Sequence, residues 1–202
     1  MAEETTDELM RATYRALCKR GYAALTMRDI ADESSKSKAT LHYHFDGKHD
    51  LLVSFLEFLD ERFARKIAAI DADDPTARLF ALLDVACPSA EGDSGEFQTA
   101  MLELTAQAPY EKAYRERLLG FETRLRAEFE RVLDSGVESG AFDDDVEPER
   151  TAEFLLTAID GAQTRRVAVG HDADKMREMI RNYVETAVVS DESPRRTEVR
   201  AE

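Results

Sequence analysis

The segment SKSKATLHYHF, residues 35–45, gathers side chains that bind phosphates and base edges within an otherwise acidic chain. It holds two lysines, two histidines, a tyrosine and a threonine in eleven residues. Ammonium, imidazole and hydroxyl groups, together with helix N-termini, are the donors that proteins use toward phosphate oxygens. Lysine also bonds N7 and O6 of guanine, and the methyl group of alanine or threonine contacts the thymine methyl group. The chemistry of this segment is therefore that of a DNA-contacting surface.

The charge of the chain is unevenly distributed. The formal net charge is −15, with 27 Lys and Arg against 42 Asp and Glu, so the protein as a whole is a poor binder of polyanions. Residues 11–48, however, hold eight Lys or Arg and only four Asp or Glu. Such a basic island is where a phosphate backbone would dock. Only seven of the basic residues are lysine. An acidic, lysine-poor chain predicts a halophilic source, with an acidic protein of an ordinary cell as the alternative.

Several classes of function have little support in the sequence. No apolar run reaches the ~18 residues of a membrane span, and the polar start MAEETTDELM is unlike a secretory signal peptide, so we expect a cytoplasmic protein. Cys18 and Cys87 predict two reduced thiols, with a disulfide or redox pair as the alternative. His42 and His44 point to different faces of a helix, which disfavours a metal site. No glycine-rich phosphate loop or nucleophile elbow is present, so neither an enzyme nor a cofactor is predicted.

The elements that must position the segment are all predicted to be helices. Apolar residues recur at helical spacing between prolines and glycines, and no stretch alternates as a strand would. Thr5 with Glu8 fits a capping box, Gly21 ends the first helix, and Thr26 and Ser37 are N-caps of two short helices. We therefore predict an all-α fold of about nine helices. Their expected ranges are about 6–20, 27–33, 38–44, 48–63, 76–86, 96–107, 114–137, 150–169 and 174–189.

The second and third predicted helices, joined by the short polar turn SSKS, form a helix-turn-helix arrangement. Leu41 and Phe45 would anchor the third helix in a core and leave its polar face outward. Two plainer interpretations stay open, namely Tyr43 as a core residue and Lys36 with Lys38 as a solvated turn. The DNA contacts that we predict are Thr26, Arg28, Lys36, Ser37, Lys38, Ala39, Thr40, His42, Tyr43, His44 and Lys48.

Residues 14–52, YRALCKRGYAALTMRDIADESSKSKATLHYHFDGKHDLL, resemble the DNA-binding domain of TetR/AcrR-family transcriptional regulators. The resemblance rests on residues in the family's order and spacing: Gly21, Thr26, Arg28, Ile30, Ala31, Ser37, Lys38, Leu41, Tyr43, His44, Phe45, Lys48, Leu51 and Leu52. It implies a three-helix N-terminal DNA-binding domain followed by a larger helical effector-binding and dimerisation domain. We expect these over residues 1–50 and 51–190, with a disordered tail over 191–202.

The turn between the two short helices departs from the family pattern. The family usually has Ala-Gly-Val-Ser where this chain has Ser34, Ser35, Lys36 and Ser37. We expect strain at Ser35, because glycine fits a positive φ there and serine does not. Lys36 replaces a core valine, so its side chain is expected to snorkel or to face DNA. His42 also stands where the family commonly has tyrosine.

The resemblance further implies a homodimer that binds a palindromic operator, most often as a repressor released by a small, apolar effector. The stretch LLTAIDGAQTRR resembles the penultimate dimerisation helix of some members. The expected dimer residues are Leu155, Ile159, Ala162, Met176, Met179, Ile180, Tyr183 and Val184. The candidate effector residues are Phe58, Phe80, Met101, Thr105, Tyr110, Tyr114, Phe121 and Gln163, although aromatic residues at helical spacing are more often core. The alternative function is an acidic helical interaction module that binds no DNA.

Overall fold

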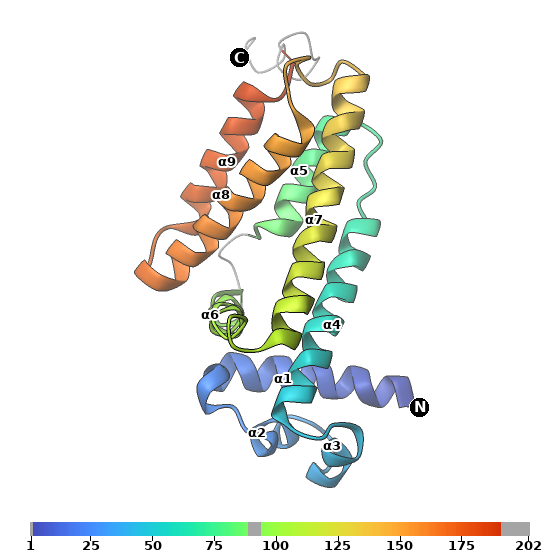
Figure 1. Ribbon diagram of the computed structural model, residues 1–202, viewed down its shortest axis with the longest axis vertical. Helices are drawn as coiled ribbons and strands as arrows, with labels where there is room; N and C mark the ends of the chain where they lie inside the picture. The colour runs from blue at the N-terminus through green and yellow to red at the C-terminus, as the bar shows by residue number, and fades with distance from the viewer. Residues whose placement is uncertain (1, 89–93, 191–202) are drawn as a thin grey trace. The chain divides into compact units, whose positions relative to one another are not determined.

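The computed structural model describes residues 2–88 and 94–190, and the regular elements of this part of the chain are all helices, with no strand. The predicted all-α fold class is thereby confirmed. The predicted tail over 191–202 lies outside the described residues. The helices shown in Figure 1 are α1 Ala2–Ala24, α2 Met27–Asp32, α3 Lys38–His44, α4 Lys48–Ala68, α5 Pro75–Ala86, α6 Ser94–Thr105, α7 Lys112–Glu138, α8 Pro148–Val169 and α9 Ala173–Ala187.

The chain packs as two compact units. Unit 1 consists of residues 1–64 and 92–121, and unit 2 of residues 65–91 and 122–202. Unit 1 therefore contains α1, α2, α3 and α6, and unit 2 contains α5, α8 and α9, while α4 and α7 each contribute residues to both. The predicted boundary at residue 50, between a DNA-binding and an effector-binding domain, stays a prediction. It divides the chain by function, whereas these units divide it by packing and need not be continuous in sequence.

The beginnings of the short helices follow from capping residues. The hydroxyl of Thr26 accepts a hydrogen bond from the N–H of Asp29 at 3.2 Å, and the carboxylate of Asp29 accepts one from the N–H of Thr26 at 3.0 Å. Ser37 caps α3 by accepting from the N–H of Thr40 at 3.2 Å. Both caps agree with the sequence prediction. The box predicted at Thr5 is wrong, because α1 already begins at residue 2.

The sequence predicts that Gly21 ends the first helix, whereas in the structure it kinks α1 and a short helical stretch follows it. Its backbone has φ 70° and ψ 167°, a conformation that side chains with a Cβ rarely adopt. The chain turns at this residue and reaches the N-cap of α2 five residues later. We refer to residues 21–26 as the α1–α2 corner.

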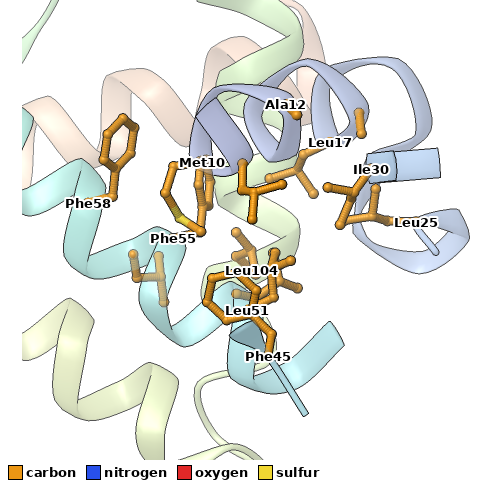
Figure 2. Close-up of a cluster of buried hydrophobic side chains, with 14 of the residues drawn as sticks. Met10, Ala12, Leu17, Leu25, Ile30, Phe45, Leu51, Phe55, Phe58 and Leu104 are labelled. Carbon is orange, nitrogen blue, oxygen red and sulfur yellow. The ribbon is translucent and has the colours of Figure 1, made fainter. Parts of the chain in front are cut away.

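The core of unit 1 joins the first four helices to α6 (Figure 2). Figure 2 shows Leu17 of α1, Ile30 of α2 and Leu51 of α4 directed into one cluster with Leu104 of α6. All four side chains have no exposed surface. Because short helices bury little area by themselves, α2 and α3 depend on this shared core for their position.

Unit 2 has its own apolar interior and close helix packing. Phe129 of α7, Leu155 of α8 and Val184 of α9 are fully buried. Gly136 of α7 is in contact with Phe142, since an added Cβ would lie 2.0 Å from a ring carbon. The helical stretches of the described residues include none with the length and apolar character needed to cross a membrane.

Candidate nucleic-acid interface

The outer face of α3 is formed by the polar residues that the sequence predicts to touch DNA. Lys38, Ala39, His42 and Tyr43 are exposed, with Tyr43 at 86% of its full exposure, while Leu41 between them is completely buried. Tyr43 packs edge-on against the ring of His44, with 5.3 Å between ring centroids. The core interpretation of Tyr43 is therefore wrong, because its ring projects into solvent. Figure 1 shows α3 beside α2 at the edge of unit 1.

The turn before α3 is held by Glu8 of α1, for which the sequence predicts a capping role. The carboxylate of Glu8 accepts hydrogen bonds from the N–H of Ser35, at 2.9 Å, and from its hydroxyl. The ammonium of Lys36 lies 3.4 Å from the same carboxylate. These hydrogen bonds from Ser35, with the charge of Lys36, hold the pKa of Glu8 below its ordinary value. Lys36 is thus neither a free solvated lysine nor directed along the outer face of α3.

The strain expected at Ser35 is absent. Within residues 2–88 and 94–190, positive φ values occur only at glycines. The turn instead uses hydrogen bonds, since Ser34 Oγ accepts from the N–H of Lys36 at 2.9 Å and Glu8 binds Ser35. A serine-rich turn can therefore take the place of a glycine turn without a left-handed residue.

Thr26, Arg28, Ser37 and Thr40 lie at the N-terminal ends of the two short helices. Thr26 and Ser37 use their hydroxyls as caps, and the hydroxyls of Ser37 and Thr40 lie 3.0 Å apart. Arg28 is exposed, with Nε 3.9 Å from the carboxylate of Asp32 one turn later. Backbone N–H groups at these two N-termini are favourable for phosphate.

Lys48 is turned into unit 1, which the sequence did not predict. Its ammonium donates a hydrogen bond to the backbone carbonyl of Tyr22 and lies 4.4 Å from the centre of the Tyr22 ring. Burial lowers the pKa of Lys48, and the nearby carboxylate of Glu103 opposes that effect. In this conformation its ammonium does not extend the exposed face of α3.

Most of the other basic residues of the island are paired with acids of unit 1. Arg15 and Lys19 both bind Glu33, Lys19 at 2.7 Å, and Arg20 lies 3.2 Å from Asp29. Lys38, in contrast, forms no ion pair or hydrogen bond with any residue that the structure describes. Sequence reasoning missed the acids as ion-pair partners, because their spacing to the basic residues does not reveal contacts between helices. Lys38 is consequently the cation most available to a phosphate or a base.

The candidate effector residues are divided between the two units. Six of them belong to unit 1 and the other two, Phe80 and Gln163, to unit 2. Phe58 and Tyr114 are buried in the core, Thr105 is exposed, and Tyr110 is 84% exposed. Met101 packs against the same core, and Phe121 contacts the ring of Phe63 at 4.8 Å.

The two candidates in unit 2 have partners of their own. The ring of Phe80 lies 4.6 Å beneath the guanidinium of Arg181, and Gln163 Nε2 donates to the carbonyl of Ala86 at 2.9 Å. One surface hollow lies along α1 and α2 and another along α9, and none of the eight candidates lines either of these. Tyr110 in particular cannot line an enclosed pocket at its present exposure.

The predicted dimer residues divide into buried and accessible positions. Leu155, Ile159, Ala162, Ile180 and Val184 are buried within unit 2. They pack the helices of this unit together and have almost no surface to offer a second copy. Met176 and Tyr183 are partly exposed, and Met179 is 60% exposed. Phe154, which was not predicted, is half exposed and its ring lies 4.6 Å from that of Tyr183.

The metal interpretation of the histidines also finds no cluster to support it. Across the described residues, no three His, Cys, Asp or Glu side chains are grouped as metal ligands would be. His49, the third histidine of the region, instead stacks on Tyr114 at 5.0 Å and lies 3.1 Å from the carboxylate of Glu111.

A capped α2, a short turn and an α3 with a buried inner and a polar outer face define a helix-turn-helix DNA-binding protein. Residues 9–55 match the family described as bacterial regulatory proteins, tetR family. Residues 75–189 match the C-terminal domain of BetI-type transcriptional repressors. The chain belongs to the TetR family of DNA-binding transcriptional regulators. Since this family consists of regulators, the prediction that the protein is not an enzyme is confirmed.

Individual relatives agree with this assignment. The HTH-type transcriptional repressor KstR2 of Rhodococcus jostii strain RHA1 is 30% identical over 154 residues, which cover 73% of this chain and 72% of the relative. A TetR transcription regulator from Haloarcula marismortui ATCC 43049 superimposes with a TM-score of 0.85 at 38% identity, covering 92% of this chain and 99% of that one. A transcriptional regulator from Saccharomonospora viridis in complex with choline has the same fold, with a TM-score of 0.82 at 24% identity over 93% and 99% of the two chains.

Proposed function

We propose that this regulator is a homodimeric repressor that binds a palindromic operator and is released by a small, apolar effector. Residues 1–50 act as the DNA-binding domain, and residues 51–190 bind the effector and form the dimer. The two α3 helices of the dimer enter half-sites about one helical turn of DNA (~34 Å) apart, or a multiple of that distance. The acidic, lysine-poor composition and the likeness to the Haloarcula marismortui regulator support a halophilic, cytoplasmic setting.

The observation that carries the DNA-binding part is the outer face of α3. Lys38, His42 and Tyr43 are exposed there, while Leu41 fixes the helix in the core of unit 1. Lys38 can reach a guanine edge or a phosphate, Ala39 and Thr40 a thymine methyl group, and Tyr43 a phosphate oxygen. Ser37, Thr26 and the N-termini of α2 and α3 supply further phosphate donors.

The dimer is supported by an apolar surface on the α8–α9 pair. Half-exposed Phe154 and partly exposed Tyr183 form an aromatic pair, and Met179 adds an exposed apolar side chain on α9. Aromatic and methionine side chains are enriched in such interfaces. Size-exclusion chromatography with light scattering should give a dimer at micromolar concentration. Phe154→Ala with Met179→Ala should shift it toward monomer, whereas Leu119→Ala, an exposed apolar residue of α7, should not.

Repression and release follow from the geometry of a dimer that presents two α3 helices to DNA. An effector bound in the 51–190 domain would change the tilt of α4, and the separation of the two α3 helices would no longer fit the operator. The alternative of an interaction module without DNA is set aside, because the family binds DNA.

Fluorescence anisotropy with DNA from the region upstream of the gene tests the proposal, in KCl from low to molar concentration. Tyr43→Ala and Lys38→Ala should each weaken DNA binding by about tenfold, because each removes a side chain that contacts DNA and does not support the fold. The matched controls are Tyr110→Ala, an equally exposed tyrosine, and Lys112→Ala, an exposed lysine of α7. Both controls should bind as the wild type does.

The stoichiometry and a random-sequence selection complete the test. We expect two chains per site and a selected sequence with two-fold symmetry. Failure to select any sequence at any salt concentration would overturn the proposal. Equal losses in the α3 variants and in their controls would show that the interface lies elsewhere.

A further inference from the structure

Charged side chains from two other helices hold both backbone groups of Tyr22, the residue after the kink at Gly21. The N–H of Tyr22 donates a hydrogen bond to the carboxylate of Glu103 on α6. Its carbonyl accepts one from the ammonium of Lys48 on α4. A single residue of the α1–α2 corner is therefore fixed from two sides within unit 1.

The backbone at Gly21 is shaped to admit the carboxylate of Glu103. A Cβ added to Gly21 would lie 2.9 Å from Glu103 Oε2 and 3.2 Å from Oε1, closer than side chains normally approach. The positive φ of 70° at Gly21 also disfavours any residue with a side chain. Both observations favour glycine at position 21, and the first leaves room there for the carboxylate of Glu103.

Glu103 stands on a helix that packs into the core of unit 1. Its neighbours Ala100 and Leu104 on α6 are fully buried in the core of unit 1, as Figure 2 shows for Leu104. Tyr14 of α1 packs on Phe97 of α6 with 5.0 Å between ring centroids. Because α6 is held in this way, a hydrogen bond from it to the corner fixes the corner itself.

The side chain of Tyr22 extends the attachment to the beginning of α7. Its ring lies edge-on to that of Tyr114, with 6.5 Å between centroids, and burial raises the pKa of Tyr114. Tyr114 in turn stacks on His49 of α4, which pairs with Glu111. The corner therefore contacts α4, α6 and α7 before the chain enters α2 at Met27.

We infer that Glu103 is a positioning residue for DNA binding, because its hydrogen bond to Tyr22 fixes the direction in which α2 and α3 leave α1. Glu103 touches no DNA in this scheme and acts only through the corner. The inference rests on the proposed function, in which α3 reads the operator. It also attaches α6 to the corner that leads into the reading helices, through a residue that no sequence motif indicated.

The first test compares DNA affinities of three variants with that of the wild type, using a sequence that the wild type selects. Glu103→Ala removes the acceptor and should weaken binding about tenfold. Glu103→Gln keeps an amide oxygen for the N–H of Tyr22 and should stay within about threefold of the wild type. Glu96→Ala is the matched control, because it removes an exposed glutamate from the first turn of the same helix, and it should have no effect.

The second test observes the hydrogen bond directly and needs no DNA. Protein labelled with ¹⁵N-tyrosine gives amide signals from six tyrosines, and Tyr22→Phe identifies that of Tyr22. This signal should change its chemical shift in Glu103→Ala, which removes the acceptor of the hydrogen bond, and it should keep its position in Glu96→Ala. If Glu103→Ala does not fold, Glu103→Asp, whose carboxylate is set back from Tyr22 by one methylene group, replaces it in both tests.

The outcomes separate this inference from the proposed function. A wild type that binds no DNA would defeat the proposed function itself. A wild type that binds, with Glu103→Ala binding as well as Glu96→Ala, would overturn the inference alone. So would a loss in Glu103→Gln as large as in Glu103→Ala, or a Tyr22 amide signal that keeps its position in Glu103→Ala.

Discussion

α3 and α9 are both surface helices with charged outer faces, yet their charges have different roles. On α3, Lys38 and His42 form no ion pair or hydrogen bond with any residue within the described ranges. On α9, Arg177 and Arg181 both bind the carboxylate of Asp84 on α5 at 2.6 Å. The fold of unit 2 uses the charges of α9, whereas the fold of unit 1 leaves those of α3 available. Substitutions that affect binding should therefore separate from substitutions that affect folding.

The largest effect should appear within α3, between its inner and outer faces. Leu41→Ala empties a fully buried site and should lower the free energy of unfolding by about 2–5 kcal/mol. Tyr43→Ala, on the exposed side, should change it by less than about 0.5 kcal/mol. Urea unfolding followed by circular dichroism measures both. Comparable losses of unfolding free energy in the two variants would contradict the division of α3 into a structural inner face and a DNA-binding outer face.

A smaller effect should distinguish the cations of the two helices. Arg181→Ala removes an ion pair with Asp84 and a cation–π contact with Phe80, and it should cost about 1 kcal/mol of stability. Lys38→Ala should leave stability within about 0.5 kcal/mol of the wild type. The same unfolding experiment applies, with DNA affinity as the second readout. Destabilisation by Lys38→Ala would mean that α3 also relies on its charge.

The salt dependence of DNA binding should sharpen the comparison further. Lys38→Gln should reduce the slope of log K against log salt by about 0.9 for each phosphate that the variant no longer neutralises. Arg28→Gln should reduce it by less, because Arg28 must first leave Asp32. Asp29 and Glu33 likewise form ion pairs with Arg20 and Lys19. Because of this internal pairing, we expect a shallow salt slope for the wild type and DNA binding that persists at high KCl. Anisotropy titrations over a series of KCl concentrations give the slopes, and a steep wild-type slope would contradict this expectation.

The smallest effect concerns the turn before α3 and depends on pH. Because the folded-state pKa of Glu8 lies below its ordinary value of 4.5, the ionised carboxylate stabilises the fold at pH values above that. This contribution is lost as the pH falls through the folded-state pKa. Glu8→Gln should therefore be less stable than the wild type at pH 7, and the difference should shrink below pH 4.5. Urea unfolding across this range, with Glu96→Gln as the control, would refute the assignment if the difference stayed constant.

Local sequence signals are sufficient for the helices and for the faces of α3. Thr26, Ser37 and Gly21 mark ends or interruptions of helices that the structure confirms. Leu41 is expected to be buried and is. These features depend on residues within one or two helical turns, where spacing alone constrains the backbone.

Contacts between distant segments could not be predicted in the same way. Glu8 binds Ser35 across 27 residues, and Glu103 binds Tyr22 across 81. The sequence predicts a phosphate contact at Lys48 because its position in the motif is visible, while its carbonyl partner at Tyr22 is not. The burial of five of the eight expected dimer residues has the same cause, since an apolar stripe does not show whether it packs against its own chain or against another copy.

The participation of α6 in the core of unit 1 limits how this family member could exchange parts with its relatives. Residues 1–55 carry the reading helices, but Ala100 and Leu104 complete the core on which those helices rest. A chimera that joined this N-terminal segment to a relative's effector domain would lack these complementary surfaces and the acid that fits Gly21. Recombination at the apparent domain boundary would therefore succeed only when the segment 94–105 is inherited together with the first four helices.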